Sequence, residues 1–150
     1  MYLKEYLKQF GNKKIKLFVD MDGVIVDYEV GNISRYDIKR PLTTSLNKLE
    51  EISKYNNIDL FILSISKTDL GLKEKNIWLD KYAPFFKLEN RIIISKEHTN
   101  GEPSKKLKSD YLKTVEGEVI ILIDDDPSIL KEVSNNNKNV YLLKDTVLID

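Results

Sequence analysis

Two aspartates, Asp20 and Asp22, follow an apolar run, Leu17–Val19, that has the character of a buried strand. Buried strands do not normally end on paired carboxylates, because like charges a few ångströms apart repel each other and each resists leaving water. A divalent cation resolves this repulsion, and Gly23 permits the turn that would bring both carboxylates to one spot. Open α/β sheets bind ligands at the carboxyl ends of their strands. The pattern therefore predicts a Mg²⁺-assisted site at the end of this strand.

A second apolar run, Val119–Ile123, also ends in carboxylates, here the three successive residues Asp124, Asp125 and Asp126. Asp126 precedes Pro127, and an N-cap aspartate before a proline at the first helical position favours a helix start. We therefore expect these two residues to open the next helix. Helix capping alone is the alternative explanation for both acidic runs.

The segment Asp20–Asp27 resembles DxDGxxxD, the first motif of the haloacid dehalogenase superfamily of phosphohydrolases. Its Met-Asp-Gly-Val form and the following Tyr28 are most similar to the 5′(3′)-deoxyribonucleotidase branch and its phage and bacterial relatives. The fourth motif of the superfamily is an acidic pair that completes the shell of a Mg²⁺ ion. By position the resemblance implies Asp125 as the direct ligand and Asp124 as the supporting one, with the reverse assignment left open.

The second motif of the superfamily is a Ser or Thr hydroxyl at the end of the second strand. Ser64 matches it best because it directly follows the apolar run Phe61–Leu63, and Ser66 is a second hydroxyl that could contact substrate. A hydroxyl there can donate a hydrogen bond to a phosphoryl oxygen. Serines after a strand also cap the following helix, so capping is the alternative.

The third motif is a lysine near the start of a later helix, where it offsets the negative charge of the phosphoryl group and the aspartates. Lys105, Lys106 and Lys108 are all candidates. We select Lys108 because it stands three residues before Tyr111 and so resembles the Lys-x-x-Tyr pattern of nucleotidase-like relatives.

The resemblance implies that Asp20 attacks phosphorus and forms an aspartyl-phosphate, while Asp22 protonates the leaving oxygen and then activates water. Ser64 and Lys108 would hold the phosphoryl oxygens. The Mg²⁺ ion would lie between the Asp20 carboxylate, the Asp22 backbone carbonyl and Asp125. The presence of Asp22 favours phosphatase or phosphotransferase chemistry, because dehalogenases of the superfamily lack this residue and transport ATPases replace it.

The chain has 150 residues, enough for a sizeable core, and we expect one domain over residues 1–150. Its 24 basic and 24 acidic side chains cancel, so no basic excess indicates obligate nucleic-acid binding. Because the chain has no cysteine and one histidine, His98, thiolate chemistry and a multi-histidine zinc site are excluded. No apolar run approaches membrane-spanning length and no secretory signal is visible, so we expect a cytoplasmic protein. The sequence does not indicate an oligomeric state.

Helical periodicity alternates with short apolar runs, as in βαβ units. We expect helices over residues 2–10, 44–54, 68–82 and 104–115 and after Asp126, and strands near 17–19, 58–63, 92–95, 119–123 and 140–143. The pattern predicts an α/β fold, a doubly wound parallel sheet of about five strands. The resemblance supplies the strand order 5-4-1-2-3.

The segment from about residue 28 to 43 occupies the place where the superfamily inserts a cap domain. About a dozen residues remain there, too few for a helical-bundle cap, so the cap should be minimal or absent. The deoxyribonucleotidases carry a larger cap, and this chain therefore departs from them where substrate is chosen. Tyr28, Arg35 and Tyr36 could stack on a base or grip a second phosphate, or they could simply pack.

The expected substrate is a small phosphorylated molecule such as a nucleotide. A nearly capless site would also admit a macromolecular end, such as a nucleic-acid 3′-phosphate or a phosphoprotein. A third hypothesis is that the chain is a non-enzymatic phospho-receiver domain. The acceptor aspartate of such a domain should end the middle strand, where this chain has Ser95. We expect Trp78 in the core rather than stacked on a base, and His98 on the surface rather than against substrate.

Overall fold

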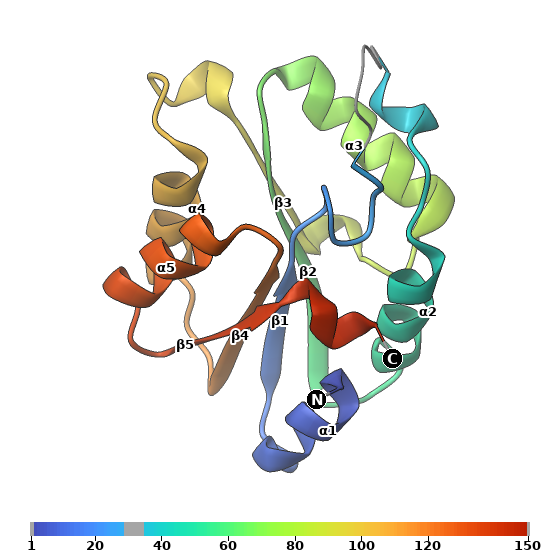
Figure 1. The fold of residues 1–150 in the computed structure, drawn as a ribbon, viewed down its shortest axis with the longest axis vertical. Helices are drawn as coiled ribbons and strands as arrows, with labels where there is room; N and C mark the ends of the chain where they lie inside the picture. Colours follow the sequence, from blue (N-terminus) through green and yellow to red (C-terminus); the bar gives the residue numbers. More distant parts are fainter. Residues whose placement is uncertain (1, 29–34, 150) are drawn as a thin grey trace.

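The computed structural model describes residues 2–28 and 35–149, which form a five-stranded parallel sheet with helices on both faces (Figure 1). The strands run in the order β3-β2-β1-β4-β5. They are β1 (Ile15–Val19), β2 (Ile58–Ser66), β3 (Arg91–Ser95), β4 (Val119–Asp124) and β5 (Val140–Lys144). Counted from the other edge, this is the predicted order 5-4-1-2-3, so the fold prediction is confirmed.

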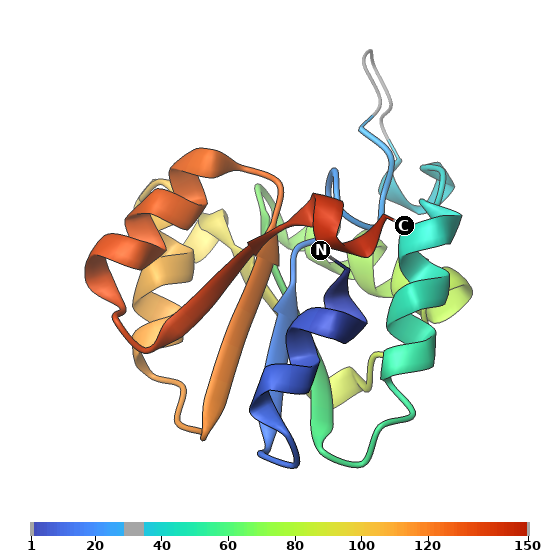
Figure 2. The same cartoon turned by 60° about the horizontal axis from the view of Figure 1, so that its bottom comes forward.

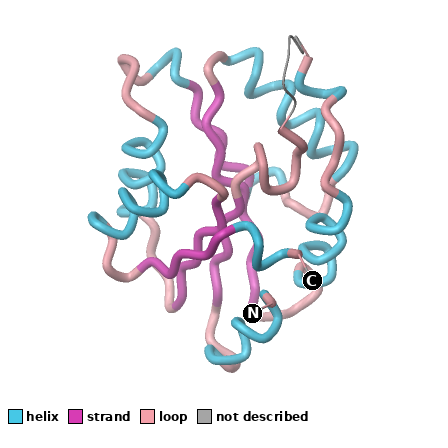
Figure 3. Tube along the Cα trace, viewed as in Figure 1, coloured by secondary structure: helices cyan, strands magenta, loops and turns pink. Residues whose placement is uncertain are grey.

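The helices connect these strands and cover the sheet, as the tube in Figure 3 shows. They are α1 (Leu3–Leu7), α2 (Thr43–Ile52), α3 (Asp69–Tyr82), α4 (Ser104–Lys113) and α5 (Pro127–Asn136). Short 3₁₀ turns lie at Lys8–Phe10, Tyr36–Ile38, Leu88–Asn90, Lys96–His98 and Asp145–Leu148. None of the helices within the described ranges is long and apolar enough to cross a membrane.

The alternation of side chains along each strand divides the core into two layers. In β1, Leu17 and Val19 face α1, α2 and α3, whereas Phe18 faces α4 and α5. β4 alternates in the same way. Figure 2 shows the sheet between these two helical layers. The strands are apolar on both faces because both faces are covered.

Several element bounds differ from the predicted ones by a few residues, and the predicted start of α5 is confirmed. The expected helix over residues 2–10 is α1 followed by a 3₁₀ turn, because the short segment tightens before Gly11, yet it still buries Leu3, Leu7 and Phe10. β2 continues to Ser66 because its last residues pair with β3. Asp126 caps α5 through the Ser128 amide, and Pro127 is the first helical residue, as predicted.

The topology brings the two acidic runs together. β1 and β4 are neighbours, and Val19 lies opposite Ile123, so Asp20 and Asp124 reach the same edge of the sheet. β1 has β2 as its neighbour on one side and β4 as its neighbour on the other, so the direction of the strand order reverses at β1. Such a switch point opens a crevice at the carboxyl ends of the strands, which is where ligands bind in α/β sheets.

The segment between β1 and α2 is fastened to α3. Residues 29–34 of the expected cap insertion (about 28–43) lie outside the described residues. In the described remainder, the Tyr36 amide donates to Glu74 Oε2 at 2.8 Å and Trp78 Nε1 donates to the Lys39 carbonyl at 2.9 Å. Trp78 itself is fully buried, in agreement with its predicted core position.

Candidate active site

Asp20 and Asp124 both contact the buried ammonium group of Lys108. Lys108, from the first half of α4, places its Nζ 2.9 Å from Asp20 Oδ1 and 2.7 Å from Asp124 Oδ2. All three side chains are buried. The second oxygen of Asp124 accepts a hydrogen bond from the Asp126 amide, so both oxygens of this carboxylate are hydrogen-bonded.

Asp125 completes an acidic cluster that could hold a metal ion. Carboxylate oxygens of Asp20, Asp124 and Asp125 all lie within 4.8 Å of one another. Gly23 adopts a φ of 79°, in the left-handed region that favours glycine, and a Cβ built there would collide with the Asp125 carboxylate. Glycine is therefore required at this position both by the turn and by the approach of Asp125.

The cluster carries more negative charge than Lys108 offsets. Burial raises the pKa of Asp20 to about 7, and Asp124 adds to the rise while Lys108 opposes it. Burial also raises the pKa of Asp125, with Asp124 contributing. Burial disfavours the Lys108 ammonium, but Asp20 and Asp124 outweigh it and raise the lysine pKa. Three carboxylates around one ammonium leave an excess of two negative charges when all are ionised, which matches one divalent cation.

A pocket of about 160 Å³ opens over the cluster. Its lining includes Asp20, Asp22, Tyr28, Ser64, Ser104, Lys108, Asp124 and Asp125. Ser64, on β2, thus lies in the same pocket as the aspartates. Ser66 instead donates to the Thr68 carbonyl at 2.7 Å and supports the turn into α3.

The alternative lysines of α4 point elsewhere. Lys106 pairs with Asp110 and Glu102 on the helix surface, and Lys105 is exposed. Lys108 is the lysine of the three whose ammonium contacts the acidic cluster, because it lies on the buried face of the helix with Leu107 and Leu112.

Asp22 is held outside the three-carboxylate cluster by residues that the sequence did not single out for this contact. Tyr36 donates to Asp22 Oδ1 at 2.8 Å, and Lys75 Nζ lies 3.3 Å from Asp22 Oδ2. Burial and the Asp22 carboxylate raise the pKa of Tyr36, which keeps its hydroxyl a donor. Lys39 Nζ lies 3.7 Å from Asp22 Oδ1.

Lys75 had a signal in the sequence. It stands three residues before Trp78 and four before Leu79, so it lies on the buried stripe of α3. A lysine on a buried stripe needs an acceptor, because burial disfavours the ammonium. Burial does lower the pKa of Lys75, and Asp22 is the first of the groups that oppose this shift.

Comparison with known proteins rests on structure. No protein-family model and no curated protein sequence matches the chain. A chain of the Pnkp1/Rnl/Hen1 RNA repair complex superposes with a TM-score of 0.65 at 13% identity, over 89% of this chain and 43% of that one. The HAD domain of the effector protein Lem4 from Legionella pneumophila gives 0.56 at 14% identity, over 87% and 85%.

A third solved structure is D,D-heptose 1,7-bisphosphate phosphatase from B. bronchiseptica with magnesium and phosphate. It superposes with a TM-score of 0.59 at 16% identity, covering 87% of this chain and 78% of that chain. Together with the strand order, these likenesses decide the architecture. The chain has the haloacid dehalogenase (HAD) fold.

The remaining predicted residues of this HAD fold lie at the rim or away from it. Tyr28 lines the pocket with 68% of its surface exposed. Arg35 pairs with Asp37 on the surface. His98 is exposed and contacts Asp69 at 2.9 Å, outside the pocket lining. Asp27 accepts a hydrogen bond from Arg40 at 2.9 Å, which joins two parts of the segment between β1 and α2.

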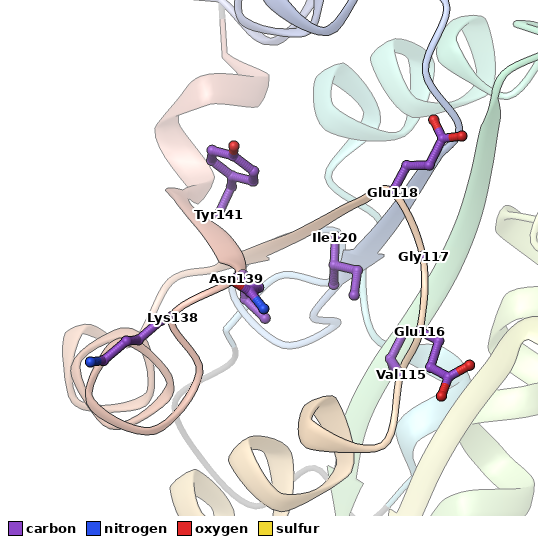
Figure 4. Close-up of a pocket in the computed structure, with 9 residues that line it drawn as sticks. Val115, Glu116, Gly117, Glu118, Ile120, Lys138, Asn139 and Tyr141 are labelled. Atoms are coloured by element: carbon purple, nitrogen blue, oxygen red, sulfur yellow. The ribbon is translucent and has the colours of Figure 1, made fainter.

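A larger cavity, of about 590 Å³, lies at the amino ends of β4 and β5, whereas the aspartates lie at the carboxyl ends of the strands (Figure 4). It is formed by the segment before β4, including Glu116 and Glu118, and the segment around Lys138–Tyr141. It contains none of the aspartates described above. Size alone does not identify the reactive site, and the smaller pocket holds the convergent charged groups.

Proposed function

We propose that this chain is a Mg²⁺-dependent phosphomonoester hydrolase with Asp20 as its nucleophile. One observation carries the proposal: the carboxylates of Asp20, Asp124 and Asp125 converge beside the Lys108 ammonium in a pocket that also contains Ser64. Convergent carboxylates, a lysine and a hydroxyl provide the groups that phosphoryl transfer requires.

The donor set fits magnesium. Mg²⁺ prefers oxygen ligands, and Asp20 and Asp125 would hold it with the Asp22 backbone carbonyl, while Asp124 orients Lys108. Magnesium supplies charge neutralisation that lets a phosphate dianion approach the carboxylates. The excess negative charge of the cluster favours such an ion.

In the proposed first step, an oxygen of Asp20 attacks phosphorus and the bond to the leaving oxygen breaks. Asp22 gives its proton to that oxygen, so the leaving group departs as a neutral alcohol. Lys108 and Ser64 stabilise the phosphoryl oxygens, because an ammonium and a hydroxyl donate to the charge that they carry. The product is an aspartyl-phosphate on Asp20.

In the second step, Asp22 takes a proton from a water molecule that attacks the same phosphorus. The bond between phosphorus and the Asp20 oxygen breaks, and the carboxylate is restored. Inorganic phosphate then leaves through the open pocket, and Asp22 again carries the proton for the next cycle. Tyr36 keeps Asp22 at the pocket during both transfers by its hydrogen bond.

The strand order argues against the phospho-receiver reading. Receiver domains have the order 2-1-3-4-5, in which the third strand is central. Here β3 is an edge strand and β1 is central, so the central strand leads to Asp20 and β3 ends at Ser95. The group best placed for phosphorylation is therefore Asp20.

Two substrate classes are separable by experiment. The resemblance of the first motif favours a nucleoside monophosphate. The exposed Tyr28 in the pocket lining and the likeness to a chain of an RNA repair complex favour a phosphate at a nucleic-acid end. Tyr28 could stack on the base next to the phosphate in either case.

The test is phosphate release from mononucleotides, sugar phosphates and a 3′-phosphorylated oligonucleotide, with Mg²⁺ and with chelator. We expect turnover that chelator abolishes and that Asp20→Asn removes without loss of fold. Asp110→Asn, on the exposed face of α4, is the matched control and should remain active. Full turnover by Asp20→Asn would exclude the proposed nucleophile.

A further inference from the structure

Lys75 is a lysine of α3 with only 4% of its surface exposed. Its Nζ lies 2.7 Å from Ser64 Oγ, 2.8 Å from the Ile65 carbonyl and 3.3 Å from Asp22 Oδ2. An ammonium has three N–H donors, so these three acceptors use all of them. A buried lysine is costly unless its charge is paired, and Asp22 supplies the pairing charge in its ionised state.

The contact with Lys75 fixes the direction in which Ser64 can donate. A hydroxyl has one proton, and Lys75 occupies a lone pair of Ser64 Oγ because an ammonium can only donate. The Ser64 proton therefore cannot point toward the Lys75 ammonium and is left for another acceptor. Ser64 lines the pocket over Asp20, so this proton can reach a phosphoryl oxygen there.

The same ammonium also holds Asp22. Tyr36 binds one oxygen of the Asp22 carboxylate and Lys75 faces the other, so rotation of the carboxylate would break one contact or the other. The two groups held by Lys75, Ser64 and Asp22, lie on different elements and both line the pocket. For stability alone, a buried lysine needs acceptors and one opposite charge anywhere around it. Lys75 instead takes its acceptors from two residues of the proposed site, Ser64 and Asp22.

We propose that Lys75 is a positioning residue that directs the Ser64 hydroxyl and the Asp22 carboxylate toward the phosphoryl group. The role rests on the proposed function, since it acts through two residues of that reaction. Lys75 itself belongs neither to the acidic cluster nor to the pocket lining, and it contacts the lining through Ser64 and Asp22. Its removal should therefore slow the chemical step more than it weakens substrate binding.

The first test compares Lys75→Met with Lys73→Met, an exposed lysine of the same helix. Methionine keeps the unbranched chain and removes the charge. With 4-nitrophenyl phosphate, Lys75→Met should lower kcat by about 100-fold with KM changed by less than about threefold. Lys73→Met should match the wild type. Thermal unfolding of both variants shows whether the fold persists.

A double-mutant cycle separates positioning from stability. If Lys75 acts through Ser64, the combination of Lys75→Met with Ser64→Ala should be no more than about threefold slower than Lys75→Met alone. If Lys75 only supports the fold, the two losses should multiply. Multiplying losses overturn the proposed role.

Chemical rescue keeps the test decisive if Lys75→Met folds poorly. The chain has no cysteine, so Lys75→Cys provides a single thiol that bromoethylamine converts into a lysine analogue in denaturant. Refolded alkylated protein should regain most of the lost kcat, and unalkylated protein should not. Absence of recovery in folded, alkylated protein contradicts the role.

A wild-type protein without phosphatase activity would contradict the proposed function, and the role of Lys75 then needs a separate measurement. If the wild type releases no phosphate from any substrate, calorimetric binding of orthovanadate with Mg²⁺ becomes the readout, because a transition-state mimic reports the contacts that act on the chemical step. Weaker vanadate binding by Lys75→Met and Ser64→Ala, without additivity, supports positioning even then. Vanadate binding by Lys75→Met equal to that of the wild type overturns it, as does the absence of vanadate binding by the wild type.

Discussion

The hydroxyl of Tyr36 donates a 2.8 Å hydrogen bond to Oδ1 of Asp22, which joins the short segment after β1 to the proposed acid–base residue. This segment is fastened to α3 by Trp78 as well. The segment that we expect in place of a cap domain thus contacts the proposed site through Tyr36.

Tyr36→Phe should lower kcat by about fivefold, because one hydrogen bond to Asp22 is worth about 1 kcal/mol. The loss should be larger for an alkyl phosphate than for 4-nitrophenyl phosphate, since a poor leaving group depends more on the proton from Asp22. Steady-state kinetics on both substrates measure this. Tyr82→Phe, whose ring packs on Trp78, is the control and should keep the wild-type ratio.

Gly23→Ala should raise the Mg²⁺ concentration needed for half-maximal activity by about tenfold or more, because Asp125 must move away from the added methyl group. A magnesium titration of turnover measures the change. Gly101→Ala is the matched control: Gly101 has a φ of 74° but no atom within 4 Å of the new Cβ. Equal effects of the two substitutions would mean that backbone strain, not the clash with Asp125, is responsible.

Asp124→Asn and Asp125→Asn should have different effects on Tm and on the increase in Tm that Mg²⁺ causes. Asp124 is fully buried against Lys108, and breaking a buried pair costs about 3 kcal/mol, so Asp124→Asn should lower Tm by about 10 °C. Asp125→Asn should leave Tm of the metal-free protein nearly unchanged or raise it, while abolishing the Tm increase that Mg²⁺ produces. Thermal scans with Mg²⁺ and with chelator measure both effects. The reverse pattern would make Asp124 the direct ligand.

Stability of the metal-free protein should fall as pH rises toward 7. Burial raises the pKa of Asp20 to about 7, whereas the unfolded value is about 3.9. The folded chain therefore keeps a proton that the unfolded chain has released, and this stabilisation is complete below about pH 4 and lost as pH rises through about 7. Urea unfolding across this range measures it, and Asp20→Asn should flatten the slope.

Magnesium should reverse that trend. Binding requires the Asp20 carboxylate, so the Tm increase caused by Mg²⁺ should be greater at about pH 8 than at about pH 5.5. Asp20→Asn should remove most of this difference. A Tm increase independent of pH would indicate that Mg²⁺ binds without Asp20.

The sequence was sufficient for the fold because its local patterns agree with one another. Apolar runs, caps such as Asp126–Pro127 and helical stripes all indicate the same alternation of strands and helices. Asp20 and Asp124 could be placed together since parallel strands carry their carboxyl ends to one edge. The spacing of Lys75 from Trp78 indicates that it is buried, but its partners and the Tyr36 contact could not be foreseen, because they depend on how α3 and the segment after β1 pack over β2.

The site joins residues that are far apart in the chain: 88 positions separate Lys108 from Asp20, and 53 separate Lys75 from Asp22. No single βαβ unit contains both pairs. A partly folded chain would leave each of these charges separately solvated in water, without the geometry that the reaction needs. The rate of phosphate release should therefore be proportional to the fraction of fully folded molecules. Activity should be lost on heating at the temperature of cooperative unfolding.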